Sequence, residues 1–209
     1  MEMVSGSGSF TAAGIQPSQS ARIEVIGVGG GGSNAVNRMI LSDLEGVGYR
    51  VLNTDAQALI QSQAQQRLQL GQTLTRGLGA GGNPTIGQKA AEESRTDLHD
   101  ALQGSDLVFI AAGMGGGTGT GAAPVIAQIA RDLGILTVAV VTKPFEFEGP
   151  ERMSNDQEGI DNLEQWVDSL IVIPNSKLKE VYGGGESIFS SFENANDCLL
   201  YTSPSPRDS

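Results

Sequence analysis

The sequence has almost none of the residues from which disulfides and metal clusters are built. Its 209 residues include a single cysteine, Cys198, and a single histidine, His99. One cysteine excludes an internal disulfide and a cysteine-rich metal site, and one histidine excludes a histidine cluster. His99 lies in a polar stretch with helical spacing, and we interpret it as a surface residue.

Basic residues and long apolar runs are also scarce. The chain has 13 Lys and Arg against 24 Asp and Glu, which gives a net charge of -11. This balance argues against nucleic-acid binding, which needs a basic surface. No apolar run is long enough to span a bilayer, and no signal-type segment opens the chain, so we expect a cytoplasmic protein without direct membrane insertion. Any phosphate site must be built from backbone amides and a few cations.

Glycine, in contrast, is abundant, with 29 residues. Nine consecutive positions read Gly113-Met-Gly-Gly-Gly-Thr-Gly-Thr-Gly121. A buried strand is predicted over 106–112 and a helix over 122–133, so this loop lies between a strand end and a helix N-terminus. Backbone amides without neighbouring Cβ atoms can close on an anion there, and the helix dipole favours negative charge. The loop therefore predicts a phosphate site.

Two other interpretations of this loop are weaker. A flexible linker is not usually flanked by a buried strand and a helix, and it favours serine over alternating threonine. A Walker A loop requires Gly-Lys-Ser or Gly-Lys-Thr, which the sequence lacks.

A second glycine-rich turn follows the predicted strand 22–28 and has the dinucleotide-binding form Gly27-x-Gly29-x-x-Gly32. The acidic residue that a dinucleotide fold places at the end of its second strand is available as Asp55. NAD binding is therefore an alternative, but it leaves the Gly113–Gly121 loop without a role. Two glycine loops on one sheet edge fit a single nucleotide held from both sides.

A third glycine-rich segment, 75–84, ends in Asn83 and Pro84, a helix N-cap followed by a first helical residue. Further strands are predicted over 49–55, 68–70, 135–142 and 168–174. Further helices are predicted over 35–44, 56–66, 84–102, 151–167, 176–182 and 187–200. This alternation predicts an α/β, Rossmann-like parallel sheet with helices on both faces and with the three loops at its carboxyl edge. Residues 1–20 are expected to be a disordered tail and 21–200 one domain.

The loop in its setting AAGMGGGTGTGAAP resembles the signature of the tubulin superfamily, and within it the FtsZ family. The resemblance extends over about 22–199. The segments VNRMI, LTRGLGAGGNP, IGQKAAEESR and DLVFIAAG look closest to cyanobacterial or plastid members. The resemblance implies a GTP-binding, GTPase-family cytoskeletal protein that polymerises head to tail into the division ring. Such a protein would lie at the division site, or in the plastid stroma. The implied partners are the protein itself and, indirectly, membrane-tethering division proteins.

The resemblance also implies a set of GTP-binding residues. They are Gly30, Gly31, Gly32, Ser33, Asn34, Ala80, Gly81, Gly82, Gly115, Gly116, Gly117, Thr118, Gly119, Thr120, Glu148, Arg152, Asn175, Phe192, Asn196 and Asp197.

Each group of these residues has an implied role. Gly30–Asn34 contact the phosphates and the nucleoside, Ala80–Gly82 approach the γ-phosphate, and Gly115–Thr120 wrap the α- and β-phosphates. Glu148 and Arg152 match ribose and phosphate contacts. GTP or GDP is the implied cofactor, with Mg²⁺ held through the phosphates because no dedicated acidic cage is visible.

The last four residues match positions around the guanine. Their chemistry suits that role, since Asp197 can accept from the guanine N1–H and amino group, which adenine does not offer. Asn175 and Asn196 can bond the base edge or a ribose hydroxyl, and the Phe192 ring can stack on a purine.

The sequence departs from the family in two places. Pro150 and Glu151 stand where many members carry basic residues, and 201–209 do not continue the family's long central helix, since prolines there cannot extend a helix. We interpret that tail as foreign to the fold. By resemblance, the catalytic carboxylates lie beyond this point, so no catalytic residue is assigned and the isolated chain is expected to be inactive. Besides NAD binding, a non-catalytic filament-capping fragment is the other alternative.

Overall fold

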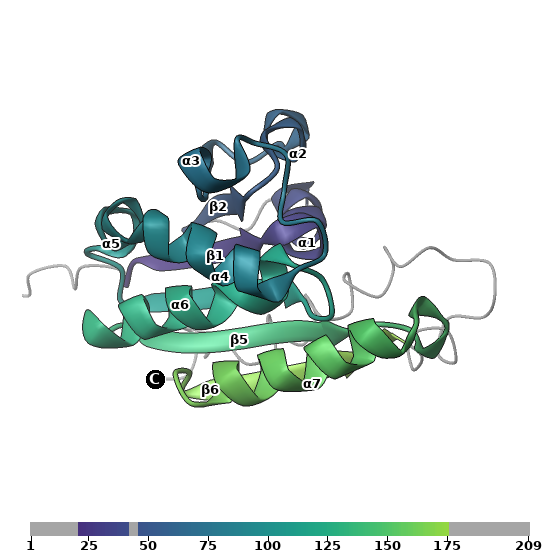
Figure 1. The fold of residues 1–209 in the computed structure, drawn as a ribbon. Helices are drawn as coiled ribbons and strands as arrows, with labels where there is room; N and C mark the ends of the chain where they lie inside the picture. Colours follow the sequence, from purple (N-terminus) through teal and green to yellow (C-terminus); the bar gives the residue numbers. More distant parts are fainter. Residues whose placement is uncertain (1–20, 42–45, 176–209) are drawn as a thin grey trace, which may run out of the picture.

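The computed structural model describes residues 21–41 and 46–175. The strands are β1 (Ile23–Val28), β2 (Val47–Asn53), β3 (Gln66–Gln69), β4 (Leu107–Gly113), β5 (Leu136–Lys143) and β6 (Ser169–Pro174). They form one sheet in the order β3-β2-β1-β4-β5-β6, and every neighbouring pair is parallel (Figure 1). This topology confirms the predicted fold class. The order changes direction between β1 and β4, and open parallel sheets bind ligands at such a switch point.

Seven helices connect the described strands. They are α1 (Gly29–Leu41), α2 (Ala56–Gln61), α3 (Gln72–Thr75), α4 (Pro84–Glu93), α5 (Arg95–Leu102), α6 (Thr118–Asp132) and α7 (Pro150–Glu164), with one 3₁₀ turn, η1 (Glu146–Glu148). In the described part of the chain, no helix is both long and apolar enough to cross a bilayer.

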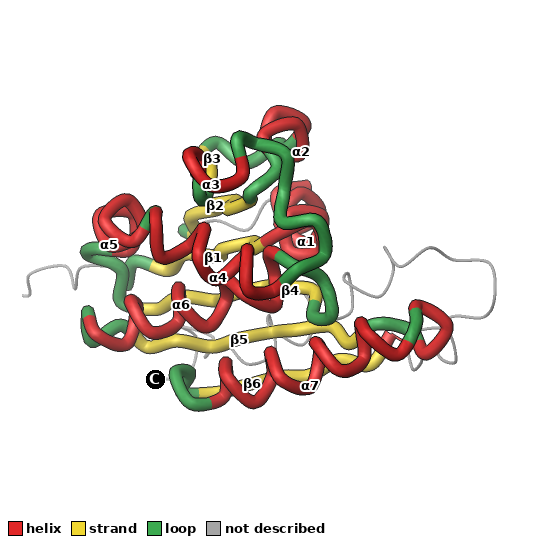
Figure 2. The backbone as a smooth tube through the Cα atoms, viewed as in Figure 1, coloured by secondary structure: helices red, strands yellow, loops and turns green. Residues whose placement is uncertain are grey.

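Two apolar clusters hold the helices on the sheet. The larger cluster joins strand side chains such as Ile26 and Ile110 to α4, α5, α6 and α7, which lie together over one face (Figure 2). The smaller cluster packs α1 and α2 onto the opposite face through Val25, Val36 and Leu59. Right-handed parallel crossovers bring the loops that follow β1, β4 and β5 to one edge.

Two glycine-rich stretches that we predicted as loops are partly helical. The first helix begins at Gly29 instead of Ala35, and the sixth begins at Thr118 instead of Ala122. Glycine is a poor helix former, but here the backbones of neighbouring elements approach too closely for a side chain. A Cβ on Gly32 would lie 2.2 Å from the Ala111 carbonyl oxygen. Tertiary packing therefore overrides the local preference.

The predicted helix 84–102 is two helices, because the chain bends at Ser94 between α4 and α5. The Ser94 hydroxyl oxygen accepts a 3.0 Å hydrogen bond from the amide of Gly71, which ties the bend to the segment after β3. The predicted helix 56–66 ends at Gln61, because the Asn37 side chain bonds the hydroxyl of Ser62 and the amide of Gln63. The short helix α3 was not predicted. The predicted elements over 176–200 and the tails 1–20 and 201–209 lie outside the described residues.

Candidate functional site

A cavity of about 450 Å³ lies at the carboxyl ends of β1, β4 and β5. Its walls are the turn into α1, the loop into α6, part of the segment before α4, and the loop between β5 and α7. The lining residues are Val28, Gly30, Gly31, Asn34, Ala80, Gly82, Gly113, Met114, Gly116, Gly117, Thr118, Gly119, Thr142, Pro144, Glu148, Arg152 and Asn175. The sheet topology thus places the cavity at the switch point.

The first wall is the start of α1. Gly29 has a φ of 70°, which turns the chain sharply from the strand into the helix. The Ser33 hydroxyl donates a 2.6 Å hydrogen bond to the Gly29 carbonyl and fixes this first turn. The helix therefore begins at the cavity, where its first amides have no intrahelical partner.

The second wall is the loop that joins β4 to α6. The Met114 amide donates a 2.9 Å hydrogen bond to the Thr142 carbonyl, which holds the loop against the end of β5. Gly117 is the N-cap of α6, and the amide of Gly121 is bonded to its carbonyl. The helix amides before Gly121 therefore lie at the free N-terminus of a fifteen-residue helix.

Gly30 and Gly116 differ from the other glycines that the structure describes. Neither has a positive φ, and a Cβ built on either would meet no atom within 4 Å. The remaining described glycines have a positive φ or a neighbour at Cβ contact distance. The fold itself therefore does not require glycine at Gly30 or Gly116, and both residues line the same cavity. Glycine at these positions leaves room for a ligand to reach the backbone.

The third wall carries the charged groups. Glu148, at the end of η1, forms a salt bridge with Arg152 in the first turn of α7, and the Glu148 carboxylate also accepts a 2.8 Å hydrogen bond from the Phe145 amide. The Arg152 side chain is 52% exposed, so its guanidinium remains reachable from solvent. It is the only Arg or Lys among the described lining residues.

Asn175 closes the described part of the cavity, directly after β6. Its side-chain oxygen is buried and has no hydrogen-bond partner from the residues that the structure describes. A buried amide oxygen without a partner carries a desolvation cost, which a donor on a ligand would remove.

Most of the site residues implied by the resemblance come together here. Twelve line the cavity: Gly30, Gly31, Asn34, Ala80, Gly82, Gly116, Gly117, Thr118, Gly119, Glu148, Arg152 and Asn175. Gly81, Gly115 and Thr120 line a neighbouring groove instead. Gly32 and Ser33 lie behind the wall, where they pack on β4 and fix the first turn of α1. Phe192, Asn196 and Asp197 lie outside the described residues.

The implied set of GTP-binding residues omits several residues that line the cavity, among them Val28, Thr142 and Pro144. Gly113 and Met114 also line it, and both belong to the loop predicted as a phosphate site. Thr142 and Pro144 lie at the end of β5, where the rule that places ligands at the carboxyl edge of a sheet would have located them. In the described part of the chain, no group of three or more His, Cys, Asp or Glu residues forms a metal site.

The fold and the cavity define a class, the nucleotide-binding domains with a parallel α/β sheet and glycine-rich phosphate loops. Residues 22–183 match the family model described as "Tubulin/FtsZ family, GTPase domain". The chain belongs to the Tubulin/FtsZ family, as the resemblance implied.

The relatives agree with this assignment. The chain is 59% identical over 182 residues to the cell division protein FtsZ of Buchnera aphidicola subsp. Acyrthosiphon pisum, with 87% of this chain and 47% of the relative covered. It is 56% identical over 185 residues to FtsZ of Wigglesworthia glossinidia brevipalpis, with 88% and 48% covered. The chain therefore spans about half the length of the curated relatives it matches. The cyanobacterial or plastid type stays a prediction.

The solved structures give the same picture. An FtsZ structure from M. jannaschii, described as an empty dimer, matches with a TM-score of 0.79 and 49% identity over 86% of this chain and 52% of the other. CetZ1 from Haloferax volcanii, described as a GDP-bound monomer, matches with a TM-score of 0.74 over 86% of this chain and 58% of the other. Its identity is 24%, so this likeness concerns the fold alone.

Proposed function

We propose that this chain binds a guanine nucleotide in the cavity between β1, β4 and β5. The observation that carries the proposal is the pair Gly30 and Gly116, two glycines that the fold does not need and that face the same cavity. Family membership supports GTP or GDP as the nucleotide.

The phosphates would lie between the N-termini of α1 and α6. Both helices point their unpaired amides and the positive end of their dipoles at the cavity. Arg152 adds a guanidinium at the rim, which is paired with Glu148 but remains half exposed. Mg²⁺ would be held by phosphate oxygens and water, since the described lining offers one carboxylate, Glu148, which is already paired.

The base would lie on the side of Asn175, whose buried oxygen can accept from a base or ribose donor. By resemblance, Phe192, Asn196 and Asp197 complete this side. A hydrogen bond to a charged group contributes about 1.5–3 kcal/mol. Asp197→Ala is therefore expected to weaken GTP binding roughly ten- to a hundredfold and to narrow the preference over ATP.

The NAD alternative has less support than guanine binding. Its acidic ribose contact would be Asp55, but one carboxylate oxygen of Asp55 caps α2 by accepting from the amides of Gln57 and Ala58. Asp55 also does not line the cavity. Its position is explained by the cap, without a dinucleotide.

Calorimetric titration of the chain with GTP, ATP and NAD tests the proposal. We expect GTP to bind at least about tenfold more tightly than ATP or NAD. Equal binding of GTP and ATP would contradict guanine recognition, and preferential binding of NAD would favour the dinucleotide alternative.

We propose that GTP hydrolysis and filament assembly require the full length of the protein, since this chain spans about half the length of its relatives. By resemblance, the intact protein hydrolyses GTP at a head-to-tail filament interface in the division ring, in the cytoplasm at the division site, and is tethered to the membrane through other division proteins. The described cavity contains no paired carboxylates to activate water. The chain alone should bind GTP and hydrolyse almost none.

A mixing experiment tests this division of roles. An intact FtsZ with a disabled GTP pocket would supply its catalytic loop to the pocket of this chain, and phosphate release should rise with its concentration. Rapid hydrolysis by the chain alone, independent of its concentration, would contradict the proposal. A filament-capping role predicts in addition that the chain shortens polymers of an active FtsZ.

A further inference from the structure

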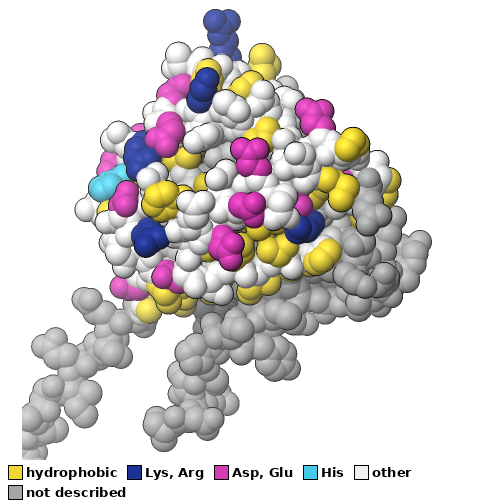
Figure 3. Space-filling model, turned by 60° about the horizontal axis from the view of Figure 1, so that its bottom comes forward, with side chains coloured by type: hydrophobic (Ala, Val, Ile, Leu, Met, Phe, Trp, Pro, Cys, Tyr) yellow, Lys and Arg dark blue, Asp and Glu magenta, His cyan; other side chains and the backbone are white. Residues whose placement is uncertain are grey.

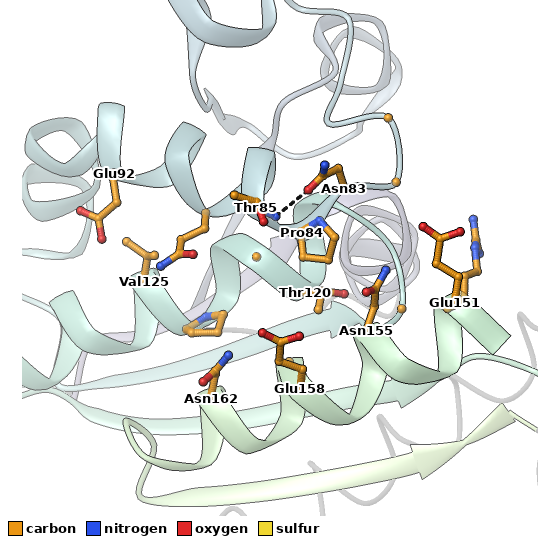
Figure 4. Close-up of a pocket in the computed structure, with 18 of the residues that line it drawn as sticks. Asn83, Pro84, Thr85, Glu92, Thr120, Val125, Glu151, Asn155, Glu158 and Asn162 are labelled. Atoms are coloured by element: carbon orange, nitrogen blue, oxygen red, sulfur yellow. Dashed lines mark hydrogen bonds between the residues drawn. The ribbon is translucent and has the colours of Figure 1, made fainter.

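A second hollow lies beside the nucleotide cavity, and most of its lining residues have no role in the proposed function. It is a groove of about 830 Å³ with α4 on one wall, α7 on the other and α6 as its floor (Figure 4). Gly82 and Arg152 line both hollows, so the groove begins where the cavity ends. It runs from there along α6 as far as Trp166.

Polar side chains line both walls at helical spacing. Four residues of α7 that are three or four positions apart line one wall: Glu151, Asn155, Glu158 and Asn162. In Figure 4 these side chains rise from α7 towards α6. The α4 wall contributes Thr85, Gln88 and Glu92. Amides and carboxylates thus alternate along the groove, and apolar lining is limited to a few side chains.

The floor contains a polar group that the protein leaves unsatisfied. Thr120 is 4% exposed, and its hydroxyl has no hydrogen-bond partner among the described residues. Thr120 lines the groove, and Figure 4 draws its hydroxyl pointing along the floor towards Asn155. A buried hydroxyl without a partner is costly, and a polar ligand in the groove would supply one. The acidic walls and this hydroxyl therefore both point to a ligand.

The charged side chains in the groove indicate which charge the ligand carries. Glu92 is paired with Arg95 at 3.1 Å, but Glu151 and Glu158 have no ion-pair partner among the described residues. Figure 3 shows acidic side chains across the middle of one face of the molecule, with basic ones mostly towards its edge. Arg152 also lines the groove, but it is paired with Glu148. The carboxylates of Glu151 and Glu158 therefore favour a positively charged occupant.

We propose that the groove binds a basic, extended polypeptide segment of another protein. Amide side chains on both walls can bond the amides and carbonyls of an extended backbone, which an amphipathic helix would not offer. Glu151 and Glu158 are seven residues apart on one helix, which corresponds to about 10 Å along its axis. In a polyproline II segment, residues three positions apart lie on the same side and are about 9 Å apart. Two lysines at that spacing could therefore pair with both carboxylates.

The test uses a labelled peptide, Gly-Lys-Ser-Gly-Lys-Ser-Gly-Lys with blocked ends, titrated with the full chain by fluorescence anisotropy at physiological salt. Glu151→Gln/Glu158→Gln should weaken binding at least about tenfold. The matched control Asp97→Asn/Glu164→Gln removes the same charge from exposed positions outside the groove and should change the affinity by less than about twofold. Thr120→Val should weaken binding as well.

Three outcomes would overturn the proposal. The first is equal weakening by the two double variants, which would mean attraction by the overall charge. The second is unchanged affinity in both Glu151→Gln/Glu158→Gln and Thr120→Val. The third is displacement of the peptide by spermine at similar concentration with the same dependence on Glu151 and Glu158, which would make the groove a polyamine site. Circular dichroism melting of each variant separates loss of binding from loss of folding.

Discussion

The hydroxyl oxygens of Thr54 and Thr118 lie 2.6 Å apart. Thr54 follows β2 and is fully buried, whereas Thr118 is the first residue of α6 and lines the cavity. This hydrogen bond therefore connects the end of one strand to the helix N-terminus proposed to hold phosphate. It therefore restrains the position of that helix terminus.

The Thr54–Thr118 contact predicts a non-additive pair of substitutions. Thr118→Val leaves the buried Thr54 hydroxyl without this partner, and each single valine variant should lower the free energy of unfolding by about 1–3 kcal/mol. The double variant removes both hydroxyls and should cost less than the sum of the two. Urea unfolding of the three variants measures this coupling. Strict additivity would show that the contact contributes nothing.

Close packing of α4 on α6 predicts a large effect at Gly121. A Cβ there would lie 2.0 Å from the Pro84 carbonyl oxygen and 2.6 Å from the Gln88 amide nitrogen, both of them backbone atoms of α4. Gly121→Ala must push the two helices apart, and we expect it to lower the free energy of unfolding by about 1–3 kcal/mol. Gly116→Ala serves as the control, because its Cβ meets open space. Thermal melting of the two variants without nucleotide compares them, and equal midpoints would refute the packing argument.

Asp156 predicts a pH dependence of stability. Burial raises the pKa of its carboxyl above the ordinary value of 3.8, and the ammonium of Lys143 at 3.5 Å offsets only part of this. The stability that a raised pKa contributes is present at low pH and is lost as pH rises through the folded-state pKa. Asp156→Asn should therefore make the protein more stable than the wild type at neutral pH. The difference should shrink as pH falls towards the ordinary aspartate range.

Lys143→Met should have the opposite effect on stability at neutral pH from Asp156→Asn. Without the ammonium, the Asp156 carboxylate keeps its burial and loses its Coulombic compensation, so its pKa should rise further and neutral-pH stability should fall. Urea unfolding across the pH range compares the two variants with the wild type. The same sign for both variants at neutral pH would show that burial does not determine the behaviour of Asp156.

The sequence predicts the sheet better than the boundaries of the helices. Alternating buried strands and helical patterns were sufficient for the parallel sheet, because strands buried on both faces appear as continuous apolar runs. The start of α6 was predicted four residues beyond its position in the structure, because glycine disfavours a helix. Glycine is nevertheless needed within this helix, since the backbone of α4 leaves no room for a side chain at Gly121. The break at Ser94 depends on a contact with Gly71, which is 23 residues away in the sequence.

The candidate site was predictable to the extent that its residues form local patterns. The glycine loops at Gly30 and Gly116 are contiguous motifs, and the edge rule brings them together. The division between cavity and groove is not local, because it depends on how α7 packs beside α6. This packing places Thr120 in the groove, although its neighbours Thr118 and Gly119 line the cavity.

The most direct measurement is GTP affinity and apo-protein stability of Gly116→Ser and Gly30→Ala, determined side by side by calorimetry and urea unfolding. Both added side chains fit the protein and enter the space assigned to the nucleotide. We predict that each variant unfolds within about 0.5 kcal/mol of the wild type and loses GTP binding by at least about a hundredfold. Wild-type GTP affinity in both variants, with unchanged stability, would contradict the assignment of this cavity to the phosphates.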